Sequence, residues 1–421
     1  MYKKILVISN NCFSLENSNG RTLAGFVKGW PIDRIAQFYT YNEVPNSGVC
    51  NNYFRVTDKQ ALFSMLKGSV AGKVDLFEAK KEKVRGPQKR LTKFRNPLIM
   101  LLRNFIWDLG FWKGKYFNDW VNVFNPDLIF VQAGDTAYRL RIATNLAKKR
   151  NIPLIIYNSE NYYFKDYNYM SNTKFTNIFY SVFIKKFRKQ LRASVNYALH
   201  TIYNNEPLKE DFDAEFNKPS SVIYNPSDII PIPYGNTENK KLKLSYLGNL
   251  GLGRHESLID LANVIQSINP SLSLDVFGKC PTLEIEEAFM ECSSIDYKGF
   301  ISYKDVKAVI SQSDILFHVE NFSDFYIKDL KYGFSTKIAD SLMSGKCFFL
   351  YAPESLACTK YMVKNNQDCV ATSSQELMKK IKIILDDPKF RIECSQKCIE
   401  LAKKNHSEDV VDKQFFNIVN S

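Results

Sequence analysis

The sequence predicts an α/β protein of two domains, each with a parallel sheet that is covered by helices on both faces. The first indication is length, because 421 residues exceed the size at which one hydrophobic core usually keeps growing. The second is the alternation of short apolar segments with segments of helical periodicity along almost the whole chain, which is typical of parallel sheets. The third is a proline-rich break near the middle, which marks a domain boundary.

The expected strands are short apolar runs separated by helical segments. They are Ile5–Ser9, Leu128–Gln132, Leu154–Tyr157, Val222–Tyr224, Lys243–Leu247, Leu272–Phe277, Ile315–Val319 and Cys347–Leu350. A representative helical segment is His255–Ile268, in which apolar side chains recur on one face. Ligands of open parallel sheets bind beyond the carboxyl ends of the strands, so we expect the functional residues in the loops that follow these strands.

The proline-rich break defines the domain boundaries. Residues 225–241 contain three prolines among turn-forming residues, and this segment is the expected linker. It separates an N-terminal domain, residues 1–224, from a C-terminal domain, residues 242–405. The last segment, residues 406–421, is expected to be a helix that could pack back on the N-terminal domain.

The composition limits the class of protein. A formal net charge of +13 favours an anionic partner, which could be a phosphorylated small molecule, a membrane surface or nucleic acid. No apolar run approaches the roughly 20 residues of a membrane-spanning helix, and the N-terminus resembles a core strand more than a signal peptide. The nine cysteines lie far apart without a Cys-x-x-Cys pair, so we expect no disulfide framework, no metal site and a cytoplasmic location.

A glycine-rich loop follows the expected strand Lys243–Leu247 and precedes a helix. It contains Gly248, Asn249, Gly251 and Gly253, with Arg254 at the start of the helix. Glycines allow the backbone to approach a ligand closely, and a helix N-terminus with an arginine attracts phosphate. The loop therefore predicts a diphosphate site, although the same pattern also occurs in ordinary strand-to-helix turns with a surface arginine.

A second loop of the same kind precedes the strand Cys347–Leu350. Gly333, Ser335 and Thr336 offer backbone and hydroxyl donors for phosphate, and Lys337 follows in the first turn of the expected helix. Asp340, about one turn further, could bind a ribose hydroxyl. The alternative is an ordinary N-capped amphipathic helix with a solvated Asp340.

As an ordered set over most of residues 240–360, these segments resemble the donor domain of retaining GT-B-fold glycosyltransferases, particularly those of bacterial capsule and cell-surface polysaccharide assembly. Members of that family carry a Glu, then Gly-Phe-Gly, and a second Glu eight residues after the first. Gly333 and Phe334 match the Gly-Phe, Ser335 replaces the last Gly, and Asp340 matches the second Glu, which binds the ribose. Tyr332 stands in place of the first Glu, which leaves the identity of the sugar open.

The resemblance implies two Rossmann-like domains that face a central cleft. It also implies a metal-independent, retaining transfer from a nucleotide-diphosphate sugar to a lipid-linked or glycan acceptor, with no other cofactor. Arg254 and Lys337 would oppose the pyrophosphate, and Phe300, in a loop that often lines the nucleobase, would contact the donor. Glu320, at the end of the strand Ile315–Val319, is the candidate for a catalytic carboxylate in place of the missing Glu, unless it is an ordinary glutamate at the rim.

The N-terminal half offers candidates for the acceptor side. Gly20 and Arg21 lie in the polar loop region after the first strand, which in the resembling enzymes approaches the donor diphosphate from the opposite wall. Glu160 follows the strand Leu154–Tyr157 and is a second catalytic candidate. Each of these residues could equally belong to an ordinary polar loop.

The segment Lys80–Trp120 interleaves basic residues with Phe, Trp, Leu and Ile, and a second basic run follows at Lys185–Arg192. Such segments suit the headgroup region of an anionic leaflet, so we expect a peripheral protein at the inner face of the cell membrane. The alternative is a solvated helical face with core aromatics.

Two rival functions remain. The net charge of +13 and the basic–aromatic segment also fit a nucleic-acid-binding protein, although that function has no use for the ordered glycines, cations and acids of the C-terminal half. The replacement of the first Glu by Tyr332 would also be compatible with a catalytically inactive GT-B scaffold.

Overall fold

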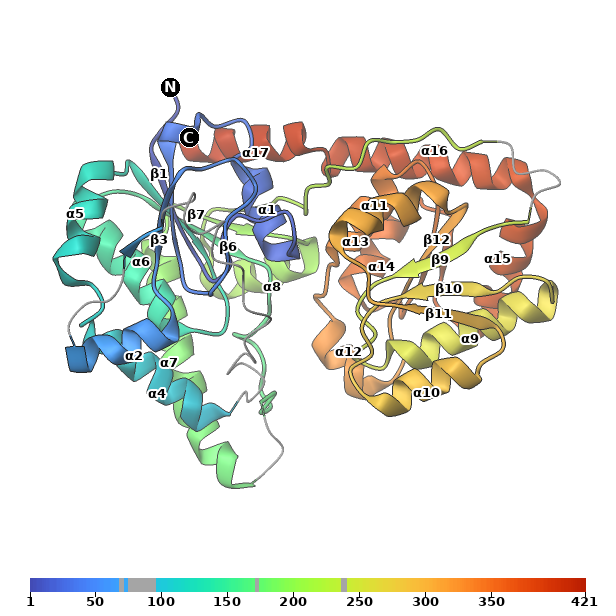
Figure 1. Cartoon of the computed structure of the whole chain (residues 1–421), viewed down its shortest axis with the longest axis horizontal. Helices are drawn as coiled ribbons and strands as arrows, with labels where there is room; N and C mark the ends of the chain where they lie inside the picture. Colours follow the sequence, from blue (N-terminus) through green and yellow to red (C-terminus); the bar gives the residue numbers. More distant parts are fainter. Residues whose placement is uncertain (68–71, 75–95, 171–173, 236–240) are drawn as a thin grey trace. The chain divides into compact units, whose positions relative to one another are not determined.

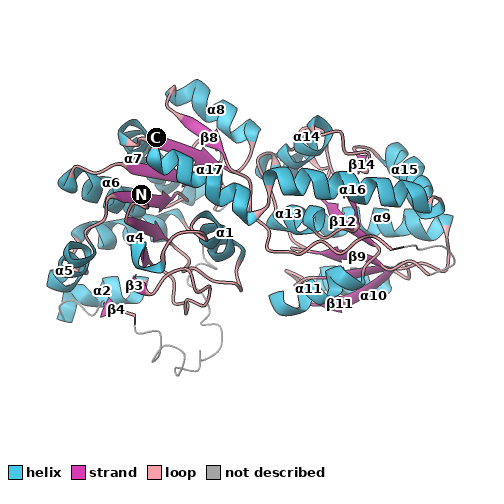
Figure 2. Cartoon of the chain, turned by 90° about the horizontal axis from the view of Figure 1, so that it is seen from above, coloured by secondary structure: helices cyan, strands magenta, loops and turns pink. Residues whose placement is uncertain are grey.

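A computed structural model describes residues 1–67, 72–74, 96–170, 174–235 and 241–421. The chain forms two compact units (Figure 1). The N-terminal unit consists of Met1–Asn204, Leu208–Ile223 and Asp412–Ser421, and the C-terminal unit of Asn205–Pro207 and Tyr224–Val411. In each unit, helices cover a central sheet (Figure 2).

The N-terminal sheet has the order β4-β3-β2-β1-β5-β6-β7-β8. Its strands are β1 (Ile5–Ser9), β2 (Ile35–Tyr39), β3 (Asn52–Arg55), β4 (Gly72–Lys73), β5 (Leu128–Gln132), β6 (Leu154–Asn158), β7 (His200–Tyr203) and β8 (Ser220–Val222). Every neighbouring pair is parallel except β3 and β4 at the edge. The central strand β1 is wholly buried, because helices cover both faces of the sheet.

The helices of the N-terminal unit supply an aromatic core. They are α1 (Ser18–Phe26), α2 (Asp58–Lys67), α4 (Pro97–Leu109), α5 (Gly114–Phe124), α6 (Ala137–Arg150), α7 (Lys174–Tyr197) and α8 (Glu206–Phe216), with a 3-10 turn at Ile32–Arg34. The ring of Trp107 stacks on Tyr138 at 4.5 Å between centroids. The end of the last helix, α17 (Glu408–Asn420), belongs to this unit, where Phe415 packs on Phe130 at 4.7 Å.

The C-terminal sheet is entirely parallel, with the order β11-β10-β9-β12-β13-β14. Its strands are β9 (Leu244–Leu247), β10 (Leu274–Phe277), β11 (Ile295–Gly299), β12 (Ile315–Val319), β13 (Cys347–Tyr351) and β14 (Val370–Ala371). Its helices are α9 (Arg254–Ile268), α10 (Leu283–Glu291), α11 (Tyr303–Gln312), α12 (Asp324–Leu330), α13 (Thr336–Met343), α14 (Ala357–Lys364), α15 (Ser374–Asp386) and α16 (Pro388–Asn405).

The side chains of this sheet alternate between two cores, as the pleat of a strand requires. Phe317 of β12 belongs to a core that includes Leu258 of α9 and Leu377 of α15. The adjacent Leu316 belongs to a second core, with Ile338 of α13. Helices α9 and α13 therefore cover opposite faces of the sheet.

Several elements differ from those expected from the sequence. Strands β2, β3, β4, β7, β11 and β14 were not among the expected strands. In β2 the polar residue Gln37 interrupts the apolar run by which the other strands were expected. Gln37 is nevertheless fully buried, because its Oε1 accepts a hydrogen bond from the Phe13 N–H at 2.8 Å. The expected strand Val222–Tyr224 is shifted, since β8 ends at Val222. No helix in the described part of the chain is long and apolar enough to cross a membrane.

Candidate functional site

The topology singles out one point on the C-terminal sheet. The connection from β9 through α9 leads outward to β10, whereas the connection from β12 through α13 leads in the opposite direction to β13. The carboxyl ends of the neighbouring strands β9 and β12 therefore form a topological switch point, where doubly wound sheets bind their ligands. The loop at residues 248–253 follows β9, and the segment at residues 320–335, which includes helix α12, follows β12.

The glycine-rich loop after β9 adopts a tight, internally bonded conformation. Asn249 Oδ1 accepts a hydrogen bond from the Gly251 N–H at 2.9 Å. Gly253 has a φ of +72°, and a Cβ at this position would lie 2.5 Å from the side chains of both Asn321 and Tyr326. Gly253 is therefore required both by its backbone angle and by contact with the loop after β12.

Arg254 and Glu320 form a buried ion pair across the switch point. Arg254 is 9% exposed and Glu320 is 3% exposed. Arg254 Nη2 donates to Glu320 Oε1 at 3.0 Å and lies 2.8 Å from Oε2, and Arg254 Nη1 donates to the Gly251 carbonyl at 3.2 Å. His318 Nε2 lies 3.1 Å from the same carboxylate. The sequence assigned separate roles to the arginine and the glutamate, whereas the structure joins them in one cluster with His318.

The electrostatics of Glu320 follow from this cluster. Burial alone raises the pKa of the Glu320 carboxyl, but the charge of Arg254, with a hydrogen bond from His318, more than offsets it and holds the pKa below its ordinary value. Glu320 is therefore held as a carboxylate. Within the described residues, Arg254 Nε has no hydrogen-bond acceptor.

The start of α13 presents the second group of predicted residues. The Ser335 hydroxyl caps the helix by accepting from the Lys337 N–H at 3.3 Å. Gly333 is exposed, and Ser335, Thr336 and Lys337 are partly exposed. This helix start is thus accessible, and its N–H groups and dipole favour an anion.

Phe334 and Asp340 are placed differently from the sequence-based interpretation. Phe334 lies in the core beside Tyr361, with ring centroids 5.1 Å apart. Asp340 is 2% exposed, and its Oδ1 accepts a hydrogen bond from the Ser227 hydroxyl at 2.9 Å. Both side chains are buried, so neither reaches the surface where a donor would bind, and their contacts position α13 instead.

Phe300, predicted to contact the donor, is 75% exposed directly after β11. The preceding Gly299 has a φ of +74°, a conformation that L side chains rarely adopt. An exposed aromatic ring at the carboxyl end of a strand is suited to stacking on a planar ligand.

A cavity of about 370 Å³ lies at the same edge of the sheet. Its lining combines two carboxylates with hydroxyl, amide and aromatic groups from the first turns of α9 and α15 and the ends of β12, β13 and β14. The lining residues are Glu256, Ser257, Asp260, Asn321, Phe322, Ser323, Tyr351, Thr372, Ser373 and Ser374. None of them was predicted from the sequence, since they come from four separate segments without a common motif.

In the N-terminal unit, Gly20 and Arg21 lie in the first turn of α1, after β1. A Cβ at Gly20 would lie 2.5 Å from the Cys12 carbonyl oxygen and 2.8 Å from the Ser14 nitrogen. The glycine is therefore required by the chain's own loop, and its contact with a donor stays a prediction. Arg21 is partly exposed, and Glu160 is exposed.

The parts of the basic–aromatic segment Lys80–Trp120 differ in their surroundings. Lys80 to Arg95 fall within residues that lie outside the described part. Trp107 and Trp112, expected at a membrane surface, are core residues with 2% or less exposure, because their indole N–H groups bond to Asp58 and to the Trp107 carbonyl. Helix α4 nevertheless keeps exposed apolar side chains. These are Leu98, Ile99, Leu102, Phe105 and Leu109, which we call the α4 face.

Neither a protein-family model nor a curated protein sequence matches this chain. Solved structures match over nearly its full length. HepE from Anabaena, crystallised with UDP, has a TM-score of 0.61 at 12% identity over 99% of each chain. Sucrose-phosphate synthase from Thermosynechococcus elongatus has a TM-score of 0.62 at 10% identity, over 99% of this chain and 98% of that one.

The α,α-trehalose 6-phosphate synthase from Burkholderia multivorans has a TM-score of 0.58 at 10% identity, over 100% of this chain and 97% of that one. These neighbours share the GT-B fold of two parallel-sheet α/β units. The fold class expected from the sequence is therefore confirmed.

Proposed function

We propose that this chain is a glycosyltransferase that uses a nucleoside-diphosphate sugar as its donor. The observation that carries the proposal is the switch point of the C-terminal sheet. There the segments after β9 and β12 are joined by the Arg254–Glu320 pair. The accessible start of α13 comes next along the chain after β12 and α12. HepE, which shares the fold, has been crystallised with UDP and with UDP-glucose. UDP-sugars are therefore the first donor class to test.

The proposed roles follow from the accessibility of each group. The N–H groups at the start of α13 and the Lys337 ammonium would bind the pyrophosphate and stabilise the charge that develops on it as the sugar leaves. Arg254 is already paired with Glu320, so its role would be to position the glycine-rich loop through the Gly251 carbonyl. Phe300 would stack on the base, whereas Asp340, which is buried with Ser227, would act only by holding α13 in place.

The proposal also includes where the acceptor binds and what kind of transfer takes place. We assign acceptor binding to the N-terminal unit near Arg21 and Glu160, which follow β1 and β6. A retaining, metal-independent transfer to a lipid-linked glycan in surface polysaccharide synthesis is the version of the function that the sequence resemblance favours.

Uridine diphosphate is expected to raise the melting temperature of the full chain. A ligand at about 100 times its Kd stabilises a folded protein by about 2.7 kcal/mol, which thermal-shift measurements resolve readily. GDP and ADP serve as comparisons for the base, and duplex DNA as the comparison for the rival function. The proposal fails if no nucleoside diphosphate stabilises the protein, or if DNA does so and the nucleotides do not.

We also propose that the N-terminal unit contacts an anionic membrane surface through the α4 face. Helix α4 packs against α7, which carries the exposed side chains of Lys185, Lys186 and Lys189 on the same unit. Arg188 and Arg192 of the same basic run are not part of this surface, because they bond to the Tyr163 carbonyl and to Glu215. Exposed apolar side chains and exposed lysines on two helices in contact suit a leaflet interface, where each basic residue contributes about 1 kcal/mol.

Combining Leu102→Asp with Phe105→Asp is expected to reduce sedimentation with phosphatidylglycerol-containing vesicles by at least about tenfold, since each buried apolar side chain contributes about 1.5–3 kcal/mol. Met290→Asp is the matched control, because Met290 is 70% exposed on α10 of the C-terminal unit. Equal binding by the double variant and the control would remove the α4 face from the proposal.

A further inference from the structure

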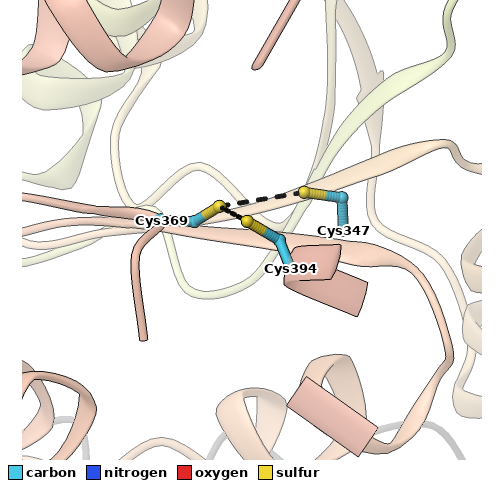
Figure 3. Close-up of side chains that lie close together, drawn as sticks. All are labelled: Cys347, Cys369 and Cys394. Atoms are coloured by element: carbon cyan, nitrogen blue, oxygen red, sulfur yellow. Dashed lines mark hydrogen bonds between the residues drawn. The ribbon is translucent and has the colours of Figure 1, made fainter. Parts of the chain in front are cut away.

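Three buried thiols converge in the C-terminal unit at the end of the sheet opposite the candidate donor site. Cys347 is the first residue of β13, Cys369 lies just before β14, and Cys394 lies on α16 (Figure 3). Their Sγ atoms all lie within 4.8 Å of one another, with 4.0 Å between Cys347 and Cys369 and 2.7 Å between Cys369 and Cys394. The candidate donor site lies at the carboxyl ends of the strands, so this cluster is separate from it.

The cluster differs from an ordinary cysteine in a hydrophobic core. A single buried thiol packs as a small apolar side chain, as Cys358 does among the residues of the second core. Here the sulfurs contact one another, and Cys369 and Cys394 lie closer than the van der Waals separation of two sulfur atoms. Cys398, one turn further along α16, donates instead to Gln367 Oε1 at 3.4 Å. Three sulfurs that converge from separate segments need a reason beyond packing.

We propose that Cys347, Cys369 and Cys394 form a three-sulfur site for a single soft cation of the copper(I) class. Thiolates select Cu(I) and zinc among the common metals. Structural zinc almost always takes four ligands, whereas the described residues supply no fourth His, Cys, Asp or Glu at this cluster. Three sulfur ligands without a fourth therefore favour a cation that accepts trigonal coordination.

The distances are close to those that such a site requires. A metal–sulfur bond of about 2.3 Å sets three trigonal sulfurs about 4 Å apart, and Cys347 and Cys369 already have this separation. Cys394 Sγ would have to move away from Cys369 by about 1 Å, which a small rotation of its side chain can provide. The bound ion would replace the thiol protons, which pass to the solvent.

A metal at this site would join α16 to the sheet. Cys394 belongs to α16, whose next residue, Ser395, already bonds to the Gly345 carbonyl at 2.7 Å. Coordination would add a second and stronger connection between α16 and the start of β13. The expected consequence is a more stable C-terminal unit when the metal is bound.

The full chain, reduced and kept without oxygen, should bind one Cu(I) in the presence of a competing chelator. Native mass spectrometry measures the stoichiometry, and the ultraviolet thiolate-to-copper charge-transfer band reports sulfur ligation. Cys347→Ser and Cys369→Ser should lose both signals. Cys398→Ser should keep them, because Cys398 is buried on α16, the helix that carries Cys394, but lies outside the cluster. Wild-type protein that binds no copper, or cysteine variants that retain the band, would overturn the proposal.

Two further measurements use the wild-type chain alone, so they test the proposal even if the cysteine variants do not fold. The X-ray absorption spectrum of the copper-loaded protein should show a three-coordinate shell of sulfur alone, and nitrogen or oxygen ligands would contradict the site. Intact mass under non-reducing conditions should show free thiols. Loss of two hydrogens with a Cys369–Cys394 crosslink would instead identify a disulfide pair and overturn the metal site.

Discussion

Arg254→Ala is expected to cost about 3–5 kcal/mol of the free energy of unfolding, because breaking a buried ion pair leaves its partner charged without compensation. Glu320 is 3% exposed and lies 2.8 Å from the Arg254 guanidinium. Donor-dependent turnover should fall as well, since the guanidinium also bonds to the Gly251 carbonyl of the glycine-rich loop. Urea unfolding measures the first effect, and sugar release from UDP-glucose the second.

Removing both charges together separates the cost of an unpaired buried charge from the cost of losing the pair. Arg254→Met combined with Glu320→Leu should recover part of the lost stability, because no uncompensated charge then stays in the core. The recovery is only partial, since buried His318 loses the carboxylate beside its Nε2. Lys397→Ala is the matched control in the same unit, because its partner Asp368 and Lys397 itself are each 46% exposed, and such surface pairs contribute about 0–1 kcal/mol. If Arg254→Ala and Lys397→Ala cost the same, the pair has no structural role.

The dependence of stability on pH provides a further test of the same pair. The pKa of Glu320 lies below its ordinary value in the folded protein, so the unfolded chain takes up a proton at higher pH than the folded chain. The stabilisation is therefore complete above the ordinary carboxyl pKa and is lost as the pH falls through the lowered folded value. In Arg254→Ala this acid loss should shrink or reverse, because burial then raises the pKa of Glu320 in the folded state and protonation no longer favours the unfolded chain.

The residues of this pair also show what the sequence could and could not predict. The glycine-rich loop and the start of α13 were found because strand, turn and helix follow one another locally in the chain. The contact between Arg254 and Glu320 depends on β9 and β12 being neighbours in the sheet, and strand order is a property of the whole fold. The same limit applies to Cys347, Cys369 and Cys394, which no short spacing motif connects.

Composition alone could not separate core from surface in the basic–aromatic segment. Trp107 and Leu102 lie on the same helix, yet Trp107 is 2% exposed and Leu102 is 53% exposed. The difference arises from which face of α4 packs on the sheet and α7. Gly20 illustrates a related limit, because a glycine needed by the chain's own loop has the same sequence signature as one needed by a ligand.

Lys337→Ala is expected to lower turnover by about 10²–10³-fold, the loss typical of removing one preorganised group that stabilises charge in the transition state. The position of this lysine supports such a role. Lys337 lies in the first turn of α13, where the helix dipole is unfavourable for a cation by about 0.3–1 kcal/mol. Because Lys337 is partly exposed, alanine should change the free energy of unfolding by only about 0.5 kcal/mol.

This combination of lost turnover with retained stability distinguishes a phosphate-binding lysine from a structural one. Lys382→Ala is the matched control, because Lys382 is an exposed lysine on α15, which packs on the opposite face of the sheet. Lys337→Arg should keep part of the activity, since it preserves the charge but changes its geometry. The Lys337 variant should also lose most of the stabilisation by UDP, because the ammonium would contact the pyrophosphate in the ground state as well. Unchanged turnover and an unchanged response to UDP would show that the pyrophosphate does not bind at the start of α13.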